Sequence, residues 1–134
     1  MNHPGLVRRR GLSAVVAATA LLLAGCASAN ANPIATFEVA GGETYKIELV
    51  TPELVEHAEA LLAGEDLAAI PLGTVVRGAS GVNAPWSWHI DPTTLEFAHV
   101  TIEVCDGLPS YVEDGTVTSD QFCPWSATVI AVEK

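Results

Sequence analysis

The first 26 residues constrain this chain most, because they decide how much of it is left to fold. Three arginines, Arg8-Arg9-Arg10, precede an uncharged and largely apolar stretch from residue 11 to residue 25. A basic start, a short apolar run and small residues at its end are typical of a secretory signal peptide. The run has about 15 residues, fewer than the roughly 20 that a membrane-spanning helix requires. We therefore expect this segment to be removed during export.

The stretch ends in Leu23-Ala24-Gly25-Cys26, which resembles the lipobox of a bacterial lipoprotein. On this interpretation residues 1–25 are a lipoprotein signal peptide, and Cys26 becomes the first residue, with lipid on its sulfur. Residues 26–33 then form an acylated N-terminus and a flexible tether, because they are small and mostly polar. The predicted location is the extracytoplasmic face of the cell membrane. The alternatives are a permanent transmembrane anchor, a plain cleaved signal and twin-arginine export at Arg9-Arg10.

The acidic composition of the remaining chain limits its partners. Removal of residues 1–25 leaves 109 residues, enough for one domain with a modest core. Three basic residues remain against 16 acidic ones, a formal net charge of −13. This charge argues against nucleic acid as a partner, and it would be repelled by anionic lipid headgroups, so attachment must come from the acyl chains. Solubility explains the charge, and a basic partner or a cation is the alternative.

The cysteine count indicates one disulfide. The chain has three cysteines, and lipid on Cys26 leaves Cys105 and Cys123 as a pair. Outside the cytoplasm an even pair is typical of a disulfide. A bridge with 17 residues between its ends would stabilise the fold by about 3 kcal/mol in the loop-entropy model. A catalytic or metal-binding pair is the alternative, although the spacing fits no C-x-x-C pattern.

A β-hairpin is predicted at the start of the domain. Residues 34–40 and 44–50 alternate apolar and polar side chains, as half-buried strands do. Gly41-Gly42-Glu43 between them predicts a three-residue loop. That loop gives one apolar face and an ion pair on the other face. The predicted cross-strand pairs are Phe37 with Ile47, Val39 with Tyr45, and Glu38 with Lys46.

A helix over residues 52–63 follows the hairpin. Thr51 is a suitable N-cap, Pro52 suits the first turn, and Gly64 is a natural stop. Leucine and alanine recur at helical spacing on one side of this segment. His57 is expected to be a solvated helix residue.

The second half is predicted to be mostly strands, over 72–77, 86–90, 95–105 and 122–132, with one helical turn near 109–114. The alternating valines and isoleucine of the third strand are expected to point inward, and residues 115–121 to form a polar loop. The predicted fold is therefore α+β, a mainly antiparallel sheet with one principal helix and one disulfide. The side chains expected to point inward from that strand are Val100, Ile102 and Val104.

Four motifs of the second half occur together in a recognisable order. They are Trp86-Ser87-Trp88-His89-Ile90-Asp91-Pro92, Ile102-Glu103-Val104-Cys105-Asp106-Gly107, Pro109-Ser110-Tyr111-Val112-Glu113 and Phe122-Cys123-Pro124-Trp125-Ser126. In this order and spacing they resemble the BP-seventy-four N-terminal domain, a small module of secreted bacterial proteins and some eukaryotic ones. The resemblance covers roughly residues 35–132, so we assign residues 34–134 to a domain of this kind. It implies a compact fold and no settled biochemical activity.

His89 is the strongest candidate for a polar site. A hairpin across residues 91–94 would set His89 opposite Glu96, with Asp91 on the same face. A histidine beside carboxylates can act as a general base or a metal ligand. The structural alternative is a histidine that is hydrogen-bonded to a neighbouring acid or to the backbone. Ser87, His89 and Asp91 follow the composition of a catalytic triad, but alternate residues of one strand lie about 6–7 Å apart, too far for a nucleophile and its base.

Two further groups of residues are candidate ligand sites. Acidic residues near His89 could supply oxygens for calcium, but no EF-hand spacing is present, and ordinary surface acids are the alternative. The tryptophans are expected in the core, and an exposed one would indicate a binding platform. The members of the two groups are Asp91, Glu96, Glu103 and Asp106, and Trp86, Trp88 and Trp125.

A candidate binding loop follows Cys105 directly. A rigid, exposed loop on a disulfide-braced scaffold loses little entropy on binding, which is how a protease inhibitor gains affinity. The residues of this loop are Asp106, Gly107, Leu108, Pro109, Ser110 and Tyr111.

The sequence contains no nucleophile elbow, metal motif or phosphate loop. We therefore predict a lipid-anchored, extracytoplasmic domain that is monomeric, has a binding or structural role, and uses no catalysis, cofactor or metal. Its predicted partners are the membrane, through the lipid on Cys26, and an unknown extracellular protein or peptide. The alternatives are a protease-inhibitor or peptide-binding module that uses the 106–111 loop, and a metal- or His89-dependent hydrolase.

Overall fold

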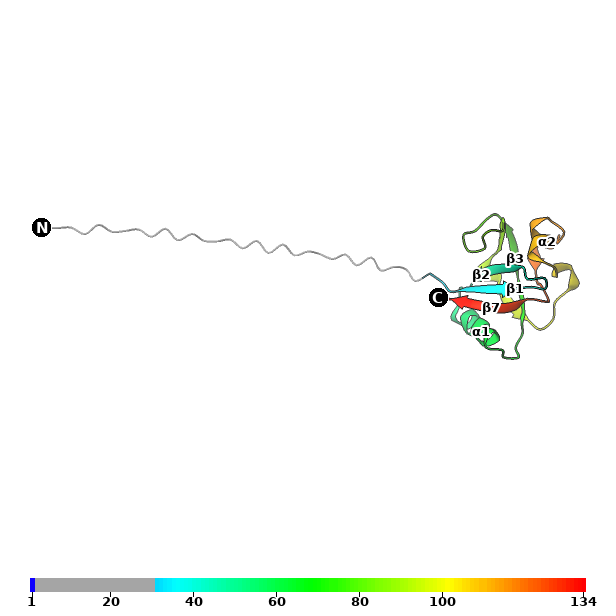
Figure 1. The fold of residues 1–134 in the computed structure, drawn as a ribbon, viewed down its shortest axis with the longest axis horizontal. Coiled ribbons are helices and arrows are strands. Elements are labelled where there is room, and N and C mark those ends of the chain that lie inside the picture. Colours follow the sequence, from blue (N-terminus) through cyan, green and yellow to red (C-terminus); the bar gives the residue numbers. More distant parts are fainter. Residues whose placement is uncertain (2–30) are drawn as a thin grey trace.

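Two small antiparallel sheets and one principal helix make up the domain (Figure 1). The computed structural model describes Met1 and residues 31–134. The predicted α+β fold with mainly antiparallel strands is therefore confirmed. The predicted signal peptide and Cys26 lie outside the described residues. The elements are β1 Ile34–Glu38, β2 Thr44–Glu48, α1 Pro52–Leu62, β3 Ile70–Arg77, β4 Trp88–Ile90, β5 Glu96–Ala98, α2 Pro109–Glu113, β6 Gln121–Phe122 and β7 Thr128–Glu133, with 3-10 turns η1 Pro92–Thr94 and η2 Glu103–Cys105.

The first sheet has the strand order β2-β1-β7, and its hairpin has a different register from the predicted one. Phe37 faces Tyr45, not Ile47, and Lys46 faces Thr36, not Glu38. The turn closes one residue earlier than expected, because Gly42 N–H donates to the Val39 carbonyl. The register moves by two residues, so each side chain keeps its face and the apolar side stays buried. The predicted Glu38–Lys46 pair is wrong.

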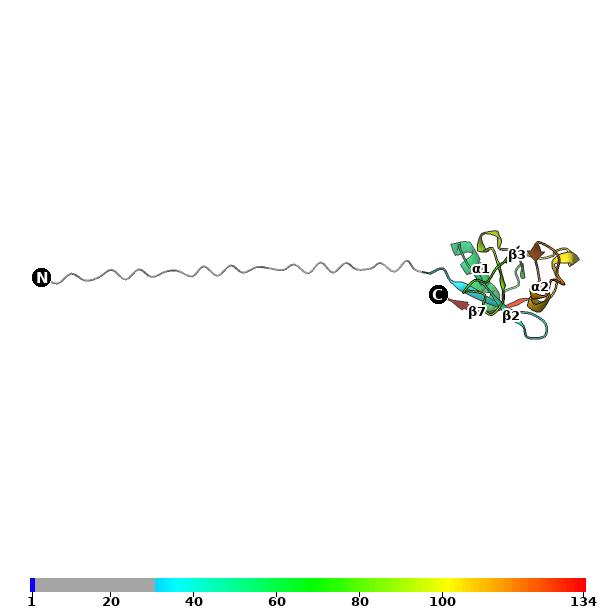
Figure 2. The same ribbon diagram turned by 90° about the horizontal axis from the view of Figure 1, so that it is seen from above.

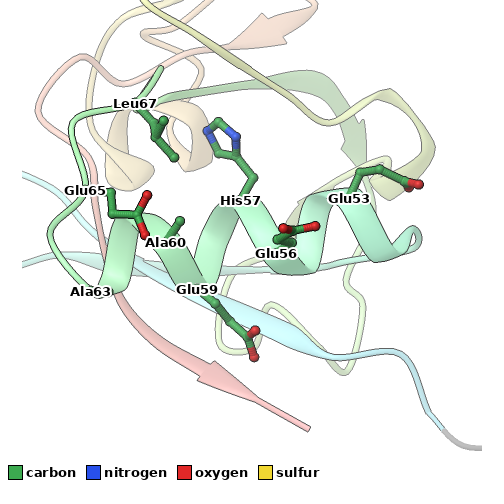
Figure 3. Close-up of a pocket in the computed structure, with 8 residues that line it drawn as sticks. All are labelled: Glu53, Glu56, His57, Glu59, Ala60, Ala63, Glu65 and Leu67. Carbon is green, nitrogen blue, oxygen red and sulfur yellow. The ribbon is translucent and has the colours of Figure 1, made fainter.

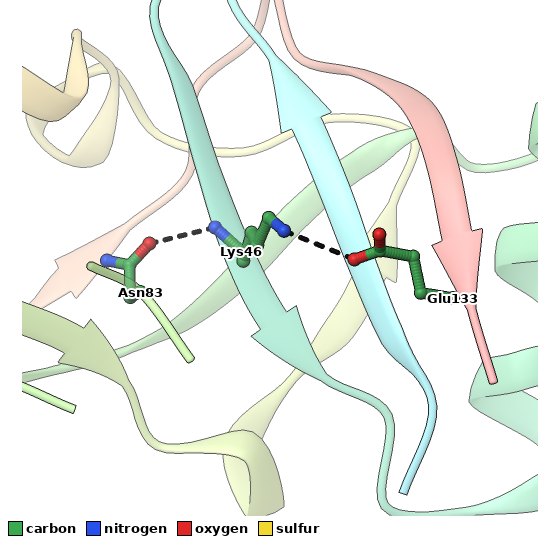
Figure 4. Close-up of polar contacts among 3 residues, drawn as sticks. All are labelled: Lys46, Asn83 and Glu133. Atoms are coloured by element: carbon green, nitrogen blue, oxygen red, sulfur yellow. Dashed lines mark hydrogen bonds and ion pairs between the residues drawn. The ribbon is translucent and has the colours of Figure 1, made fainter. Parts of the chain in front are cut away.

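Lys46 instead joins three segments of the chain (Figure 4). Its Nζ donates to Glu133 on β7 at 3.1 Å, and its backbone N–H donates to Asn83 Oδ1 at 2.8 Å. The Asn83 side chain is 1 % exposed, and its amide donates to the Trp88 carbonyl at 2.9 Å. Asn83 thus pairs a free group on the outer edge of β2 and fastens the 78–85 loop between the two sheets.

The helix α1 matches its prediction closely. Thr51 Oγ1 accepts a hydrogen bond from Leu54 N–H, Pro52 occupies the first turn, and Ala63 is the C-cap. The helix packs against β7 (Figure 1). His57 departs from its prediction, because its ring stacks on Phe97 with 4.5 Å between ring centroids and its Nε2–H donates to the Ala68 carbonyl. It is a structural link from α1 to the connector before β3 and not a solvated residue.

The second sheet is built on β3, and it contains no hairpin between β4 and β5. Both strands pair with β3, β4 at residues 75–77 and β5 at residues 70–72. Thr74 bonds through its carbonyl to Asp91 N–H and through its N–H to Thr94 Oγ1, whereas Val75 N–H donates to the Asp120 carbonyl. Neighbouring residues of a strand point their backbone groups to opposite edges. The chain therefore runs through β4, η1 and β5 along one edge of β3, and β6 occupies the other edge.

The predicted long strand over residues 95–105 is wrong. Only Glu96–Ala98 pair as β5, after which the chain leaves the sheet and turns through η2. The three residues expected to point inward are instead 82 %, 68 % and 66 % exposed, in the order Val100, Ile102 and Val104. The last predicted strand is likewise divided into β6 and β7 by the turn at residues 123–127.

Aromatic residues from both sheets form the centre of the core. Tyr45 lies between Phe37, Trp88 and Phe122, with ring centroids 5.3, 6.0 and 5.4 Å away. Trp88 is fully buried and Trp86 is half-buried, as predicted for a core role, but Trp125 is 49 % exposed. Burial raises the pKa of the Tyr45 hydroxyl well above its usual value, so this phenol stays neutral.

Candidate functional site

His89 does not meet Glu96. On β3, His89 faces Val76 while Glu96 faces Leu72, a separation of four residues or about 13 Å along the strand. The His89 Nδ1–H donates to the Gly78 carbonyl at 2.8 Å. The arrangement expected from a hairpin is therefore absent, and the ring fastens β4 to the start of the 78–85 loop.

The neighbours of His89 along the strand serve separate structural purposes. Ser87 donates through both its N–H and its hydroxyl to the Glu113 carboxylate, which ties the start of β4 to the end of α2. Asp91 accepts from the N–H and the hydroxyl of Thr93 and so caps η1. These hydrogen bonds from Thr93 lower the pKa of Asp91, and the charge of His89 adds a smaller effect in the same direction. Ser87, His89 and Asp91 thus form no relay.

Acidic side chains line a shallow hollow of about 580 Å³ beside α1 (Figure 3). Glu53 and Glu56 lie on its helical side, and His57 points toward Leu67 across it. Glu59 turns away and pairs with Lys134 Nζ at 2.7 Å. Within residues 31–134, no three His, Cys, Asp or Glu side chains come together as a group that could hold a metal ion. The hollow is a solvated acidic surface.

The 106–111 segment is fastened to the body and does not project. Asp106 Oδ1 accepts from the N–H groups of Gly107 and Trp125. Ser110 lies in the first turn of α2, and the Glu43 carboxylate accepts from both its N–H and its hydroxyl at 2.8 Å. Tyr111 is the exposed member, at 43 %. The segment therefore lacks the projecting shape on which its interpretation as a binding loop depends.

The exposed apolar residues lie just before this segment. Val100, Ile102, Val104 and Trp125 together form what we name the apolar tip. Trp125 Nε1–H donates to Thr101 Oγ1 at 2.6 Å, so the tryptophan holds the segment against the turn at residues 123–127. A hollow of about 230 Å³ lies beside Trp125 and Val100. Several large apolar side chains gathered on one exposed surface indicate an interaction site.

The predicted disulfide anchors the apolar tip. Cys105 and Cys123 are bonded, with their Cα atoms 5.0 Å apart, and both are buried. Cys123 N–H also donates to the Cys105 carbonyl at 2.7 Å. The disulfide therefore joins the end of the exposed segment to the turn that carries Trp125.

The apolar tip lies far from the end at which the chain enters the domain. Ile34 pairs with Glu133 at the entry end, whereas Ala40 N–H bonds to Ser126 Oγ next to Trp125. Six extended residues from 34 to 40 span about 20 Å. Figures 1 and 2 show the entering chain and the C-terminus at one end and α2 at the other. A tether before residue 34 would hold the opposite end of the domain, leaving the apolar tip outward.

The alternation of apolar residues marks this segment but predicts the wrong environment for it. Val100, Ile102 and Val104 match the pattern of a half-buried strand, which assigns them to the core. The signal for the true environment is local, since Asp106-Gly107 and the nearby Cys105 indicate a turn and a brace rather than a continued strand.

Comparisons with known proteins give one result. Residues 32–134 match the sequence model of the BP-seventy-four N-terminal domain, in agreement with the resemblance carried by the four motifs. No curated protein and no solved structure matches the chain. Among residues 31–134, no helix has the length and apolar content of a membrane span.

Proposed function

Because the chain belongs to the BP-seventy-four N-terminal domain family over residues 32–134, we propose that it is a lipid-anchored, extracytoplasmic domain that binds a protein partner and performs no catalysis. The apolar tip is the observation that supports this proposal. Three of its side chains are 66 % exposed or more, although the domain has a well-filled aromatic core. Burying each aliphatic side chain in an interface contributes about 1.5–3 kcal/mol.

The location and charge of the apolar tip favour a protein over a lipid surface. A domain held by its N-terminal tether presents this end away from the membrane, and the 16 acidic residues repel anionic headgroups. The same charge makes a second copy of the domain a poor occupant. A partner with an apolar groove and a basic rim complements both the exposed side chains and the acids beside them, Glu103 and Asp106.

A hydrolase or a metal site at His89 gains no support. The His89 Nδ1 hydrogen bond goes to a backbone carbonyl, and the two carboxylates expected beside the ring are separated from each other by η1. Asp91 uses its carboxylate on Thr93, and Glu96 lies on a different strand.

Site-specific photocrosslinking on the intact lipoprotein tests the proposal. A photoreactive phenylalanine derivative replaces Ile102 in one protein and exposed Glu56, on the far helix, in a matched control. We expect one discrete adduct from position 102, none of the same size from position 56, and its loss when Val100 and Val104 are changed to serine. Equal adducts from the two positions, or none from either, would refute a docking role for the apolar tip.

A further inference from the structure

We propose that residues 100–102 enter the substrate cleft of an extracytoplasmic serine peptidase that prefers aliphatic residues, with Val100 in its specificity pocket, and that the domain inhibits this enzyme. The inference rests on the proposed binding function and names the class of partner. The peptidase is the occupant that uses both the apolar side chains and the free backbone of the segment.

The backbone of the segment is extended and available. Within the described part of the chain, no backbone–backbone hydrogen bond engages the N–H groups of Val100, Thr101 or Ile102. Ile102 has φ −85° and ψ 150°, an extended conformation. A partner that binds an extended chain pairs with such groups and places alternate side chains in pockets. Peptidase clefts bind their substrates in this way, so the segment already has a substrate-like form.

Trp125 sets the direction of the side chains. The hydroxyl of Thr101 is held by Trp125 Nε1, so Thr101 faces the body of the domain. Side chains of an extended segment alternate between its two sides. Val100 and Ile102 therefore project together into solvent, in agreement with their exposed fractions of 82 % and 68 %.

Val100 is better placed than Ile102 to be the residue at the specificity pocket. Ile102 is the N-cap of η2, a position whose carbonyl accepts the first hydrogen bond of the helical turn. That oxygen cannot also occupy an oxyanion hole. The Val100 carbonyl forms no backbone–backbone hydrogen bond with any residue of 31–134, and its side chain is the most exposed of the apolar tip. Small aliphatic side chains suit the narrow specificity pocket of elastase-type enzymes.

The ends of the segment are fixed, which explains inhibition rather than digestion. On the N-terminal side, Ala98 pairs with Ile70 on β3. On the C-terminal side, Cys105 is bonded to Cys123 and the turn is tied to Asp106. A preorganised segment loses little conformational entropy on binding. After any cleavage, both new ends would stay attached to the same rigid body, so the products would separate slowly from the enzyme.

Inhibition assays on the detergent-solubilised full-length lipoprotein test this inference with pancreatic elastase and trypsin as probes. We expect the wild-type protein to inhibit elastase with a Ki of about 1 µM or lower and to leave trypsin unaffected at about 10 µM. Val100→Arg should lose at least about 100-fold in elastase inhibition and gain trypsin inhibition, because trypsin binds arginine in its specificity pocket. The control Glu56→Arg makes a larger change of charge on α1 and should behave as wild type.

The gain of trypsin inhibition separates a cleft contact from simple loss of folding. Absence of elastase inhibition by wild type together with absence of trypsin inhibition by Val100→Arg overturns the inference. Rapid cleavage after residue 100, followed by release of the enzyme at full activity, overturns it as well. If the photocrosslink at position 102 persists under either result, the proposed binding function stands and only the peptidase assignment fails.

Discussion

Asn83 provides the sharpest test of how the two sheets are joined. Asn83→Ala removes the acceptor of Lys46 N–H and the donor to the Trp88 carbonyl, while the side chain it replaces is 1 % exposed. Each group left buried and unpaired costs about 1–3 kcal/mol. Two such groups predict a loss of about 2–5 kcal/mol, a large part of the roughly 5–15 kcal/mol that stabilises a domain.

Thermal and urea unfolding of the wild-type and variant proteins, followed by tryptophan fluorescence, measures this loss. For a domain of this size, a loss of about 2 kcal/mol lowers Tm by about 8 °C or more. Asn32→Ala is the matched control, because Asn32 is exposed and its side chain bonds only to the Glu48 carboxylate. We expect it to change stability by less than about 0.5 kcal/mol.

A third variant isolates the donor. Asn83→Asp keeps an oxygen for Lys46 N–H but sets a carboxylate against the Trp88 carbonyl in place of an amide donor. It should be less stable than wild type at neutral pH and recover part of the loss in acid, where a protonated carboxyl can donate. An Asn83→Ala protein that unfolds within about 0.5 kcal/mol of wild type would contradict the role assigned to this side chain.

Three further predictions concern the cysteines and the cap of η1. Replacing both Cys105 and Cys123 with serine should lower the free energy of unfolding by about 3 kcal/mol in urea titrations, and an unchanged midpoint would contradict the bracing role. Cys26→Ser should move the protein from the membrane fraction to the medium, and full retention after fractionation would rule out lipid anchoring. The pKa of Asp91 is lowered by hydrogen bonds from Thr93, so its contribution is present above the usual aspartate pKa and is lost as pH falls through the lowered value. Asp91→Asn should therefore flatten the acid limb of a stability–pH curve, and an unaltered limb would argue against this cap.

Local chemistry predicts the elements whose partners lie close in sequence. Thr51, Pro52 and Gly64 delimit α1 because a cap, a first-turn proline and a stop act within one helical turn. The disulfide follows from counting, since a lipidated Cys26 leaves a single possible pair.

Register and connection are harder to predict because they depend on contacts distant in sequence. The hairpin loop has two glycines of positive φ, Gly41 and Gly42, and either placement of a three-residue loop keeps the same buried face. The β4–β5 connection is not a hairpin, although Asp91-Pro92-Thr93-Thr94 resembles a reversal, because Thr94 Oγ1 pairs with Thr74 N–H and lets the chain continue along β3. The separation of His89 from Glu96 follows directly from that continuation.

The exposure of the apolar tip does not follow from alternation, because a strand buried on one face and a strand presented to a partner have the same pattern. The difference lies in what fills the core. Phe37, Tyr45, Trp88 and Phe122 already close the space between the sheets, so Val100 and Ile102 have no cavity to enter. Their substitution by polar residues should leave the stability of the domain nearly unchanged. Any effect of such variants on binding or inhibition therefore reports on the surface itself, which makes the apolar tip separable from the fold that carries it.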